Sequence, residues 1–109
     1  MRRGELYRVR HPRGDPKRSR VFVVVSRTAL LESRYATVVC APVHTTRSGL
    51  ETQVDVSTEA GLKHDSSIHC DSLVSVPKEV LTDFVGRLSD VETKRLDQAL
   101  RVALALEES

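Results

Sequence analysis

The motif His69-Cys70-Asp71 combines side chains that could move protons. In an extended strand, residues i and i+2 lie on one face, so His69 and Asp71 would project together while Cys70 points into the core. A histidine that titrates near neutral pH beside a carboxylate can serve as an acid and base pair. The same spacing also fits a hydrogen-bonded pair on the surface, and the motif alone does not separate the two interpretations.

A second group of reactive side chains follows Pro42, in the polar stretch 43–49. His44, Thr45 and Arg47 supply an imidazole, a hydroxyl and a guanidinium where an apolar strand is expected to end. Polar loops held by a rigid scaffold often carry function. A solvated turn would have a similar composition, so this interpretation also stays open.

Positive charge is concentrated in the first half of the chain. Residues 1–50 carry eleven Lys or Arg and three acids, a net charge of +8, whereas residues 51–109 carry six bases and twelve acids, a net charge of −6. The stretch 13–20 contains Gly and Pro and is predicted to be a basic loop. Arg20 ends this loop and precedes an apolar strand, which would fix its backbone and aim its side chain. Such a loop suits a phosphate backbone, although pairing with the acids of the second half would produce the same asymmetry.

Metal and nucleophile chemistry are poorly supported by the residue spacing. The four histidines are scattered without ligand spacings, and no paired Cys motif is present. Cys40 and Cys70 each lie in an apolar run and are expected to be small buried hydrophobes. No strand-turn-helix elbow surrounds a Ser or Cys. Any catalysis should therefore use His, Asp, Arg and Thr without a cofactor, a set suited to RNA cleavage by its own 2′-hydroxyl.

The elements that must position these groups are mostly strands. A chain of 109 residues is expected to form one domain, residues 1–109, with a core that needs no disulfide or metal. The run 37–41 should stop at Pro42, which cannot donate to a sheet ladder. Segments 67–71 and 73–76 could be two strands or one bent strand. The expected strands are 5–10, 21–25 (buried on both faces), 37–41, 52–56, 67–71, 73–76 and 84–88.

One helix is predicted at the C-terminus. Ser89-Asp90-Val91-Glu92 is a capping-box sequence. An apolar stripe follows at three- and four-residue steps and should pack on the core. Its members are Leu96, Ala99, Leu100, Ala103 and Leu104. Many short strands followed by one helix predict a small, strongly bent sheet or barrel with the helix against one side.

Composition excludes some binding modes and locations. Aromatic residues make up 4% of the chain and Trp is absent, so nucleic-acid binding would depend on Arg planes and hydrogen bonds rather than on aromatic platforms. No apolar run approaches the ~20 residues of a membrane span, and no signal peptide is evident. The expected location is the cytoplasm, with no membrane partner.

Four stretches, in order and spacing, together with the capped terminal helix, resemble the MazF/PemK (Kid-like) toxin family. They are Arg3-Gly4-Glu5-Leu6-Tyr7, residues 20–26, residues 39–46 and His69-Cys70-Asp71. The resemblance covers nearly the whole chain. It implies a mainly β fold with a C-terminal helix, a small SH3-like β-barrel of the MazF/PemK/CcdB type. It further implies a homodimer, a cognate MazE-like antitoxin, and a metal-independent endoribonuclease that cuts single-stranded RNA to a 2′,3′-cyclic phosphate and a free 5′-hydroxyl.

The resemblance also implies roles for single residues. Arg20 matches the family's catalytic Arg, although Val21 stands where Pro is usual. His44 occupies the position of a Thr that assists at the phosphate, so either His44 has that role or Thr45 supplies the hydroxyl. In the family's Arg-Cys-Asp triplet, His69 replaces the Arg as acid and Asp71 keeps the role of base, with His44 as the other candidate base. The basic loop flanks the family's cleft, which makes Arg10, Arg13, Lys17 and Arg18 candidate RNA contacts. Arg47, in the polar stretch 43–49, is a further candidate RNA contact.

Two other functions share this fold. A CcdB-like toxin would poison a protein target, but those proteins rely on a C-terminal segment containing Trp, which this chain lacks. A non-catalytic RNA-binding module is the second alternative, because His44 replaces a catalytic Thr.

Overall fold

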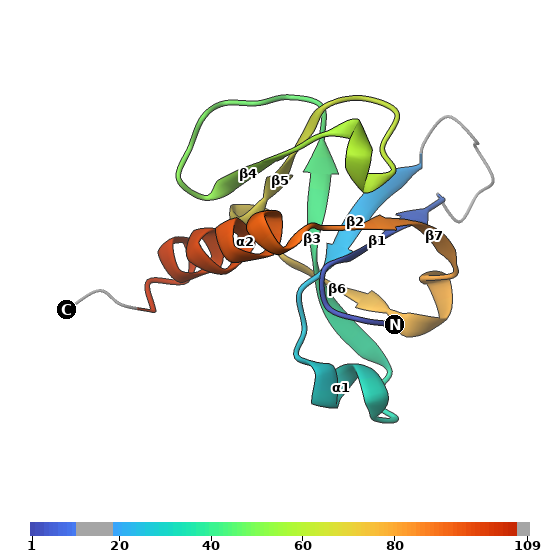
Figure 1. The fold of residues 1–109 in the computed structure, drawn as a ribbon. Helices are drawn as coiled ribbons and strands as arrows, with labels where there is room; N and C mark the ends of the chain where they lie inside the picture. The colour runs from blue at the N-terminus through green and yellow to red at the C-terminus, as the bar shows by residue number, and fades with distance from the viewer. Residues whose placement is uncertain (11–18, 107–109) are drawn as a thin grey trace.

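The computed structural model describes residues 1–10 and 19–106 (Figure 1). This part of the chain forms one bent sheet with a C-terminal helix, so the predicted fold class is confirmed. The sheet order is β4-β5-β3-β2-β1-β7, and β6 pairs with β3 beside β5. The strands are β1 (Glu5–Val9), β2 (Arg20–Val24), β3 (Thr37–His44), β4 (Gln53–Val56), β5 (Ser66–His69), β6 (Val74–Pro77) and β7 (Asp83–Arg87).

The strand β3 is central, and it is longer than the sequence predicts. It continues through Pro42 to His44, so the expectation that Pro42 ends the strand is wrong. The reason is local: β3 pairs with β6 as far as Cys40 and with β5 from Val43 onward. Pro42 stands at the change of partner, where a missing N–H removes no bond from either ladder. His44 is consequently a strand residue, held more rigidly than a loop residue would be.

The segment after β4 brings the two ends of the sheet together. A 3-10 turn, η1 (Thr58–Ala60), ends at Gly61, whose φ of 102° suits glycine. A Cβ on Gly61 would lie 2.2 Å from the Val85 carbonyl oxygen, and one on Gly86 would lie 1.8 Å from the Ala60 carbonyl oxygen. Both positions therefore need glycine. Backbone packing between η1 and β7 brings the two ends of the bent sheet together here, so that the sheet forms a half-barrel.

The core is divided by the sheet, as the continuous apolar run of β2 predicts. Val21 and Val23 belong to a larger cluster, which includes Leu6, Ile68 and Leu96. Val24 belongs to a second, smaller cluster on the other face, and Phe22 packs against it. Because successive side chains of a strand point to opposite faces, β2 is buried on both sides. This burial fixes the backbone of the strand that begins at Arg20.

The helix α2 (Asp90–Ala103) begins with the predicted capping box. Ser89 Oγ accepts from the Glu92 amide, and the Glu92 carboxylate accepts from the Ser89 amide. The stripe of Leu96, Ala99 and Leu100 is buried, whereas Leu104 lies past the helix end and is exposed. Figure 1 shows α2 beside β4. Within the described residues, no helix has the length and apolar character needed to cross a membrane.

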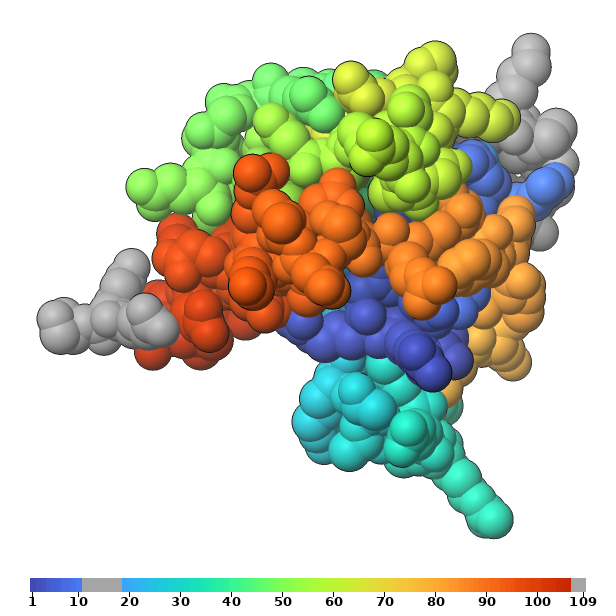
Figure 2. Space-filling view, in the orientation of Figure 1, coloured from blue at the N-terminus to red at the C-terminus, as the bar shows by residue number. Residues whose placement is uncertain are grey.

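One short helix, α1 (Thr28–Glu32), is absent from the expectations. It has five residues, and Arg27 offers no side-chain cap, so no start signal marks it in the sequence. Lys78 Nζ, from the turn η3 (Lys78–Val80), donates to the Leu30 and Ser33 carbonyls at its end. Figure 2 shows that the segment around α1 projects from the body of the molecule.

A candidate active site in a basic cleft

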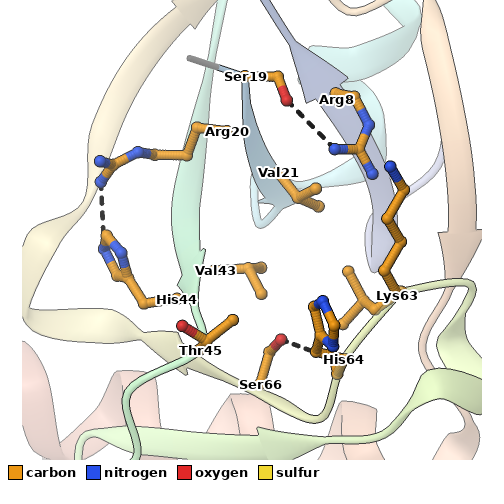
Figure 3. A pocket seen from close by; sticks show the side chains of 11 residues that line it. Arg8, Ser19, Arg20, Val21, Val43, His44, Thr45, Lys63, His64 and Ser66 are labelled. Atoms are coloured by element: carbon orange, nitrogen blue, oxygen red, sulfur yellow. Dashed lines mark hydrogen bonds between the residues drawn. The ribbon is translucent and has the colours of Figure 1, made fainter. Parts of the chain in front are cut away.

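An open cleft of about 260 Å³ lies between the start of β2, the end of β3 and the turn after Gly61 (Figure 3). Its floor contains Val21 and Val43. Among the residues that the structure describes, the lining carries Arg and Lys side chains and two imidazoles but no carboxylate, which makes it suited to a polyanion. The lining residues are Arg8, Ser19, Arg20, Val21, Val43, His44, Thr45, Leu62, Lys63, His64 and Ser66.

Arg20 and His44 form the first wall of this cleft. The antiparallel register Val21↔Val43 continues to the ends of both strands, which brings these two residues opposite each other. The Arg20 Nη1 atom lies 3.2 Å from His44 Nε2, as the dashed line in Figure 3 shows. A guanidinium can only donate a hydrogen bond, so His44 Nε2 is the acceptor. His44 is thereby assigned as a neutral imidazole with its proton on Nδ1.

The surroundings of His44 also favour the neutral ring. Partial burial lowers the pKa of His44 below its ordinary 6.5. The positive charges of Arg20 and of a protonated His69 lower this pKa further. At neutral pH, His44 consequently presents an unprotonated nitrogen toward a fixed cation. This is the state that a general base requires.

His69 lies on the neighbouring strand, with its ring against that of His44. The strand β5 pairs with β3 through His44↔Ser67, so His69 is two residues further on the same face. The two imidazole centroids are 4.6 Å apart, with the ring planes inclined at 66°. His69 Nε2 lies 3.2 Å from the Thr46 carbonyl oxygen and is assigned as the donor, since a carbonyl only accepts. Three neighbouring strands thus bring Arg20, His44 and His69 into one contiguous group.

Asp71 does not join this group within the described contacts. The strand β5 ends at His69, and Asp71 lies in a 3-10 turn, η2 (Cys70–Ser72). The expectation that His69 and Asp71 share a strand face is therefore wrong. The Asp71 carboxylate accepts a 2.6 Å hydrogen bond from Thr52 Oγ1 and does not line the cleft. Its role as base stays a prediction.

Thr45 and Arg47 occupy different environments although both lie in the same stretch. Thr45 lines the cleft beside His44 (Figure 3). The Arg47 guanidinium donates to the Ser66 and Val56 carbonyl oxygens at 3.1 and 3.0 Å, and lies 3.6 Å from the Asp55 carboxylate. These contacts anchor the stretch after β3 to β4 and β5. Two of the five N–H donors of Arg47 are occupied by these carbonyls, so the predicted contact of Arg47 with RNA would depend on the remaining donors.

The remaining predicted basic contacts lie elsewhere. Arg10 is exposed and lies 3.9 Å from the Asp83 carboxylate of β7, outside the cleft lining. Arg13, Lys17 and Arg18 lie outside the described residues.

The opposite wall of the cleft contains residues that the sequence analysis missed. Arg8, Lys63 and His64 face Arg20 and His44 across the floor in Figure 3. Pairing the first two predicted strands as a hairpin would have placed Arg8 beside Val21, which is the observed register. No signal in the sequence marks Lys63 and His64, because the position of their turn depends on Gly61 and Gly86.

Cysteine and metal chemistry find little support in this site. Cys40 and Cys70 are free and buried, as predicted. Burial raises the pKa of Cys40 to about 12 and that of Cys70 to about 11, with Asp71 adding to the latter, so neither supplies a thiolate at neutral pH. Within residues 1–10 and 19–106, no group of three or more His, Cys, Asp or Glu side chains has a metal-binding arrangement.

The sequence and the fold resemble those of known proteins. A probable endoribonuclease MazF of Mycolicibacterium smegmatis is 28% identical over 107 residues, covering 97% of this chain and 98% of that protein. A mycobacterial endoribonuclease solved in complex with its cognate antitoxin superposes with a TM-score of 0.85 at 25% identity, covering 100% of this chain and 99% of that one.

More distant structures share the fold. A MazE-MazF complex from Deinococcus radiodurans superposes with a TM-score of 0.75 at 15% identity, covering 95% of this chain and 94% of that one. The sequence model of the PemK-like, MazF-like toxins of type II toxin-antitoxin systems matches residues 2–104. With almost the whole chain matched, this protein belongs to the PemK-like, MazF-like toxin family.

Proposed function

We propose that this chain is the endoribonuclease toxin of a type II toxin-antitoxin system and cuts single-stranded RNA at specific sequences without a metal ion. The observation that carries the proposal is the contact of the Arg20 guanidinium with an unprotonated His44 nitrogen, in a cleft whose described lining has cations and no carboxylate. Cleavage at a ribose needs a base at the 2′-hydroxyl and positive charge at the phosphate. Arg20 and His44 offer both within one contact.

The proposed reaction is an internal transfer. His44 Nε2 takes the proton of the 2′-hydroxyl as the 2′-oxygen forms a bond to the adjacent phosphorus, and Arg20 moves from His44 to a phosphate oxygen. The bond from phosphorus to the 5′-oxygen breaks, and His69 donates a proton to that oxygen. The products are a 2′,3′-cyclic phosphate and a free 5′-hydroxyl. The Thr45 hydroxyl lines the cleft and can donate to the same phosphate.

Asp71 is the alternative base, as the resemblance implies. Its hydrogen bond to Thr52 and its absence from the cleft lining favour His44 instead. A route through Asp71 would require the turn η2 to move toward the substrate.

The test compares RNA with a matched oligonucleotide. Mixed RNA is first incubated with the purified chain and a chelator, and the cut ends are sequenced to find the cleaved site. An oligonucleotide carrying that site is then compared with one in which only the ribose at the cut lacks its 2′-hydroxyl. We expect cleavage of the first, with a cyclic phosphate identified by mass spectrometry, and none of the second. Cleavage of both would overturn the mechanism, and binding without cleavage would favour a non-catalytic RNA-binding module.

We also propose a homodimer that is neutralised by a MazE-like antitoxin in the cytoplasm. Relatives solved as complexes with their antitoxins support this. Tyr35, Leu50 and Phe84 are more than half exposed, and such apolar side chains suit partner surfaces. Light scattering should give twice the chain mass of 12.2 kDa. A monomer at micromolar concentration would contradict the dimer.

A further inference from the structure

We propose that Arg8 and Lys63 form a second phosphate site, which holds the RNA phosphate next to the one being cleaved. The inference rests on the proposed function, because it names how the substrate is held in the same cleft. Arg20 and His44 stand on one wall, and the side chains of Arg8 and Lys63 stand on the other, across the floor of Val21 and Val43 (Figure 3).

The positive charge of this second wall is not neutralised within the described residues. Arg8 Nη1 donates to the Ser19 hydroxyl at 3.2 Å, which orients the guanidinium without cancelling its charge. Asp83 is the register neighbour of Arg8 on β7, but its ion pair is with Arg10. No acidic side chain of residues 1–10 or 19–106 lies within ion-pair distance of Arg8 or Lys63. Unpaired cations that converge on one cleft are what an anionic ligand requires.

The two walls differ in what they can do to a phosphate. Arg20 is coupled to a neutral imidazole that can accept a proton. Within residues 1–10 and 19–106, Arg8 and Lys63 have no hydrogen bond to an imidazole or carboxylate, so we expect them to supply charge and hydrogen bonds only. A group that binds substrate and transition state equally changes KM rather than kcat. The second wall is therefore a binding element, separate from the chemistry of the first.

The position of Lys63 depends on the closure of the half-barrel. The residue follows Gly61 and Leu62, and the Gly61 backbone packs against Val85 of β7. Leu62 is buried in the larger core cluster and fixes the turn from below. Lys63 is thus an exposed side chain on an anchored backbone, which allows it to select one phosphate rather than attract RNA at long range.

The experiment uses the full chain and a short RNA that carries the experimentally identified cut site. Lys63→Ala and Arg8→Met are compared with Lys94→Ala, which removes one exposed charge from α2 outside the cleft. We expect the two cleft variants to raise KM about tenfold or more with kcat nearly unchanged. Each should make the salt dependence of log(kcat/KM) shallower by about 0.7, the loss of one contact to a single strand. Lys63→Arg should restore binding, and Lys94→Ala should behave as the unmodified chain.

A neutral methylphosphonate, placed at one phosphate at a time, then identifies the partner. In the unmodified chain, one position beside the cut should weaken binding, and Lys63→Ala should be insensitive to the same replacement. If the chain cleaves RNA and the cleft variants match Lys94→Ala, the second site is wrong while the nuclease proposal stands. If nothing is cleaved, binding of the same RNA with a 2′-O-methyl group at the cut site still tests the second site. Equal affinity and salt slope in all variants would then overturn it.

Discussion

The two walls of the cleft hold their polar groups in different ways. On the first wall, Arg20 contacts His44, and His69, which is not a lining residue of the cleft, packs against the His44 ring; the three come from adjacent strands. On the second wall, Lys63 extends from a turn and contacts no charged partner in the described part of the chain. Proton transfer requires fixed distances and a defined protonation state, whereas phosphate binding requires mainly charge within reach. Under the proposed mechanism, the strand ends of the first wall suit the chemistry, and the second wall, with Arg8 on β1 and Lys63 on a turn, suits binding.

The largest expected effect is that of Arg20→Ala on the first wall. Removing one transition-state donor typically lowers kcat by about 100 to 1000-fold. Binding of an uncleavable 2′-O-methyl RNA should fall much less, because Arg8 and Lys63 remain. Single-turnover kinetics and fluorescence anisotropy measure the two effects. Equal losses in kcat and in affinity would show that the walls are not distinct.

His44→Gln should produce the next largest effect and alter the pH profile. A base must be unprotonated, so activity is lost as the pH falls through the pKa of His44, which lies below 6.5. This acidic limb should be present in the unmodified chain and absent from the Gln variant, with a loss in kcat of at least about 100-fold. An acidic limb that survives in His44→Gln would assign the base elsewhere.

Gly86→Ala should disturb the support of the second wall. The added Cβ would meet the Ala60 carbonyl oxygen at 1.8 Å, so the η1 turn must shift. Overpacking of this kind costs about 1–3 kcal/mol of unfolding free energy, measurable by urea denaturation. In the fraction that stays folded, KM should rise more than kcat falls. A variant as stable as the unmodified chain would mean that the closure is not tight.

Arg47→Ala should have a smaller effect on either wall. The substitution removes the bonds to the Ser66 and Val56 carbonyls and loosens the stretch that contains the Thr46 carbonyl partner of His69. We expect a severalfold loss in kcat and faster amide exchange in residues 45–50. If RNA affinity falls instead, with exchange unchanged, Arg47 is an RNA contact, as the sequence analysis predicts.

Asp71→Asn should have the smallest effect, because this carboxylate lies in neither wall. Loss of a general base costs about 100-fold or more, so a change in kcat below about tenfold would exclude Asp71 from that role. Thr52→Ala is the matched control, since it removes only the partner of Asp71. A large loss in Asp71→Asn and none in Thr52→Ala would restore Asp71 as the base.

Local patterns anticipated much of the fold. The buried strand leading out of Arg20, the capping box at Ser89 and the burial of Cys40 and Cys70 follow from side-chain periodicity and hydrogen-bonding capacity, which act over a few residues. Local patterns did not predict that β3 continues past Pro42. The cost of the missing N–H of Pro42 depends on which strand lies beside that residue.

By itself, the sequence determined which side chains are present for chemistry, that Arg20 adjoins a buried strand and that His69 lies on a strand. It did not place His44 on a strand. Only the tertiary structure decided their grouping: the register of β2, β3 and β5 joins these three, and the end of β5 at His69 turns Asp71 toward Thr52. The second wall likewise depends on Gly61 and Gly86, which are far apart in the chain. Contacts between distant segments arise from packing, and no local residue pattern encodes them.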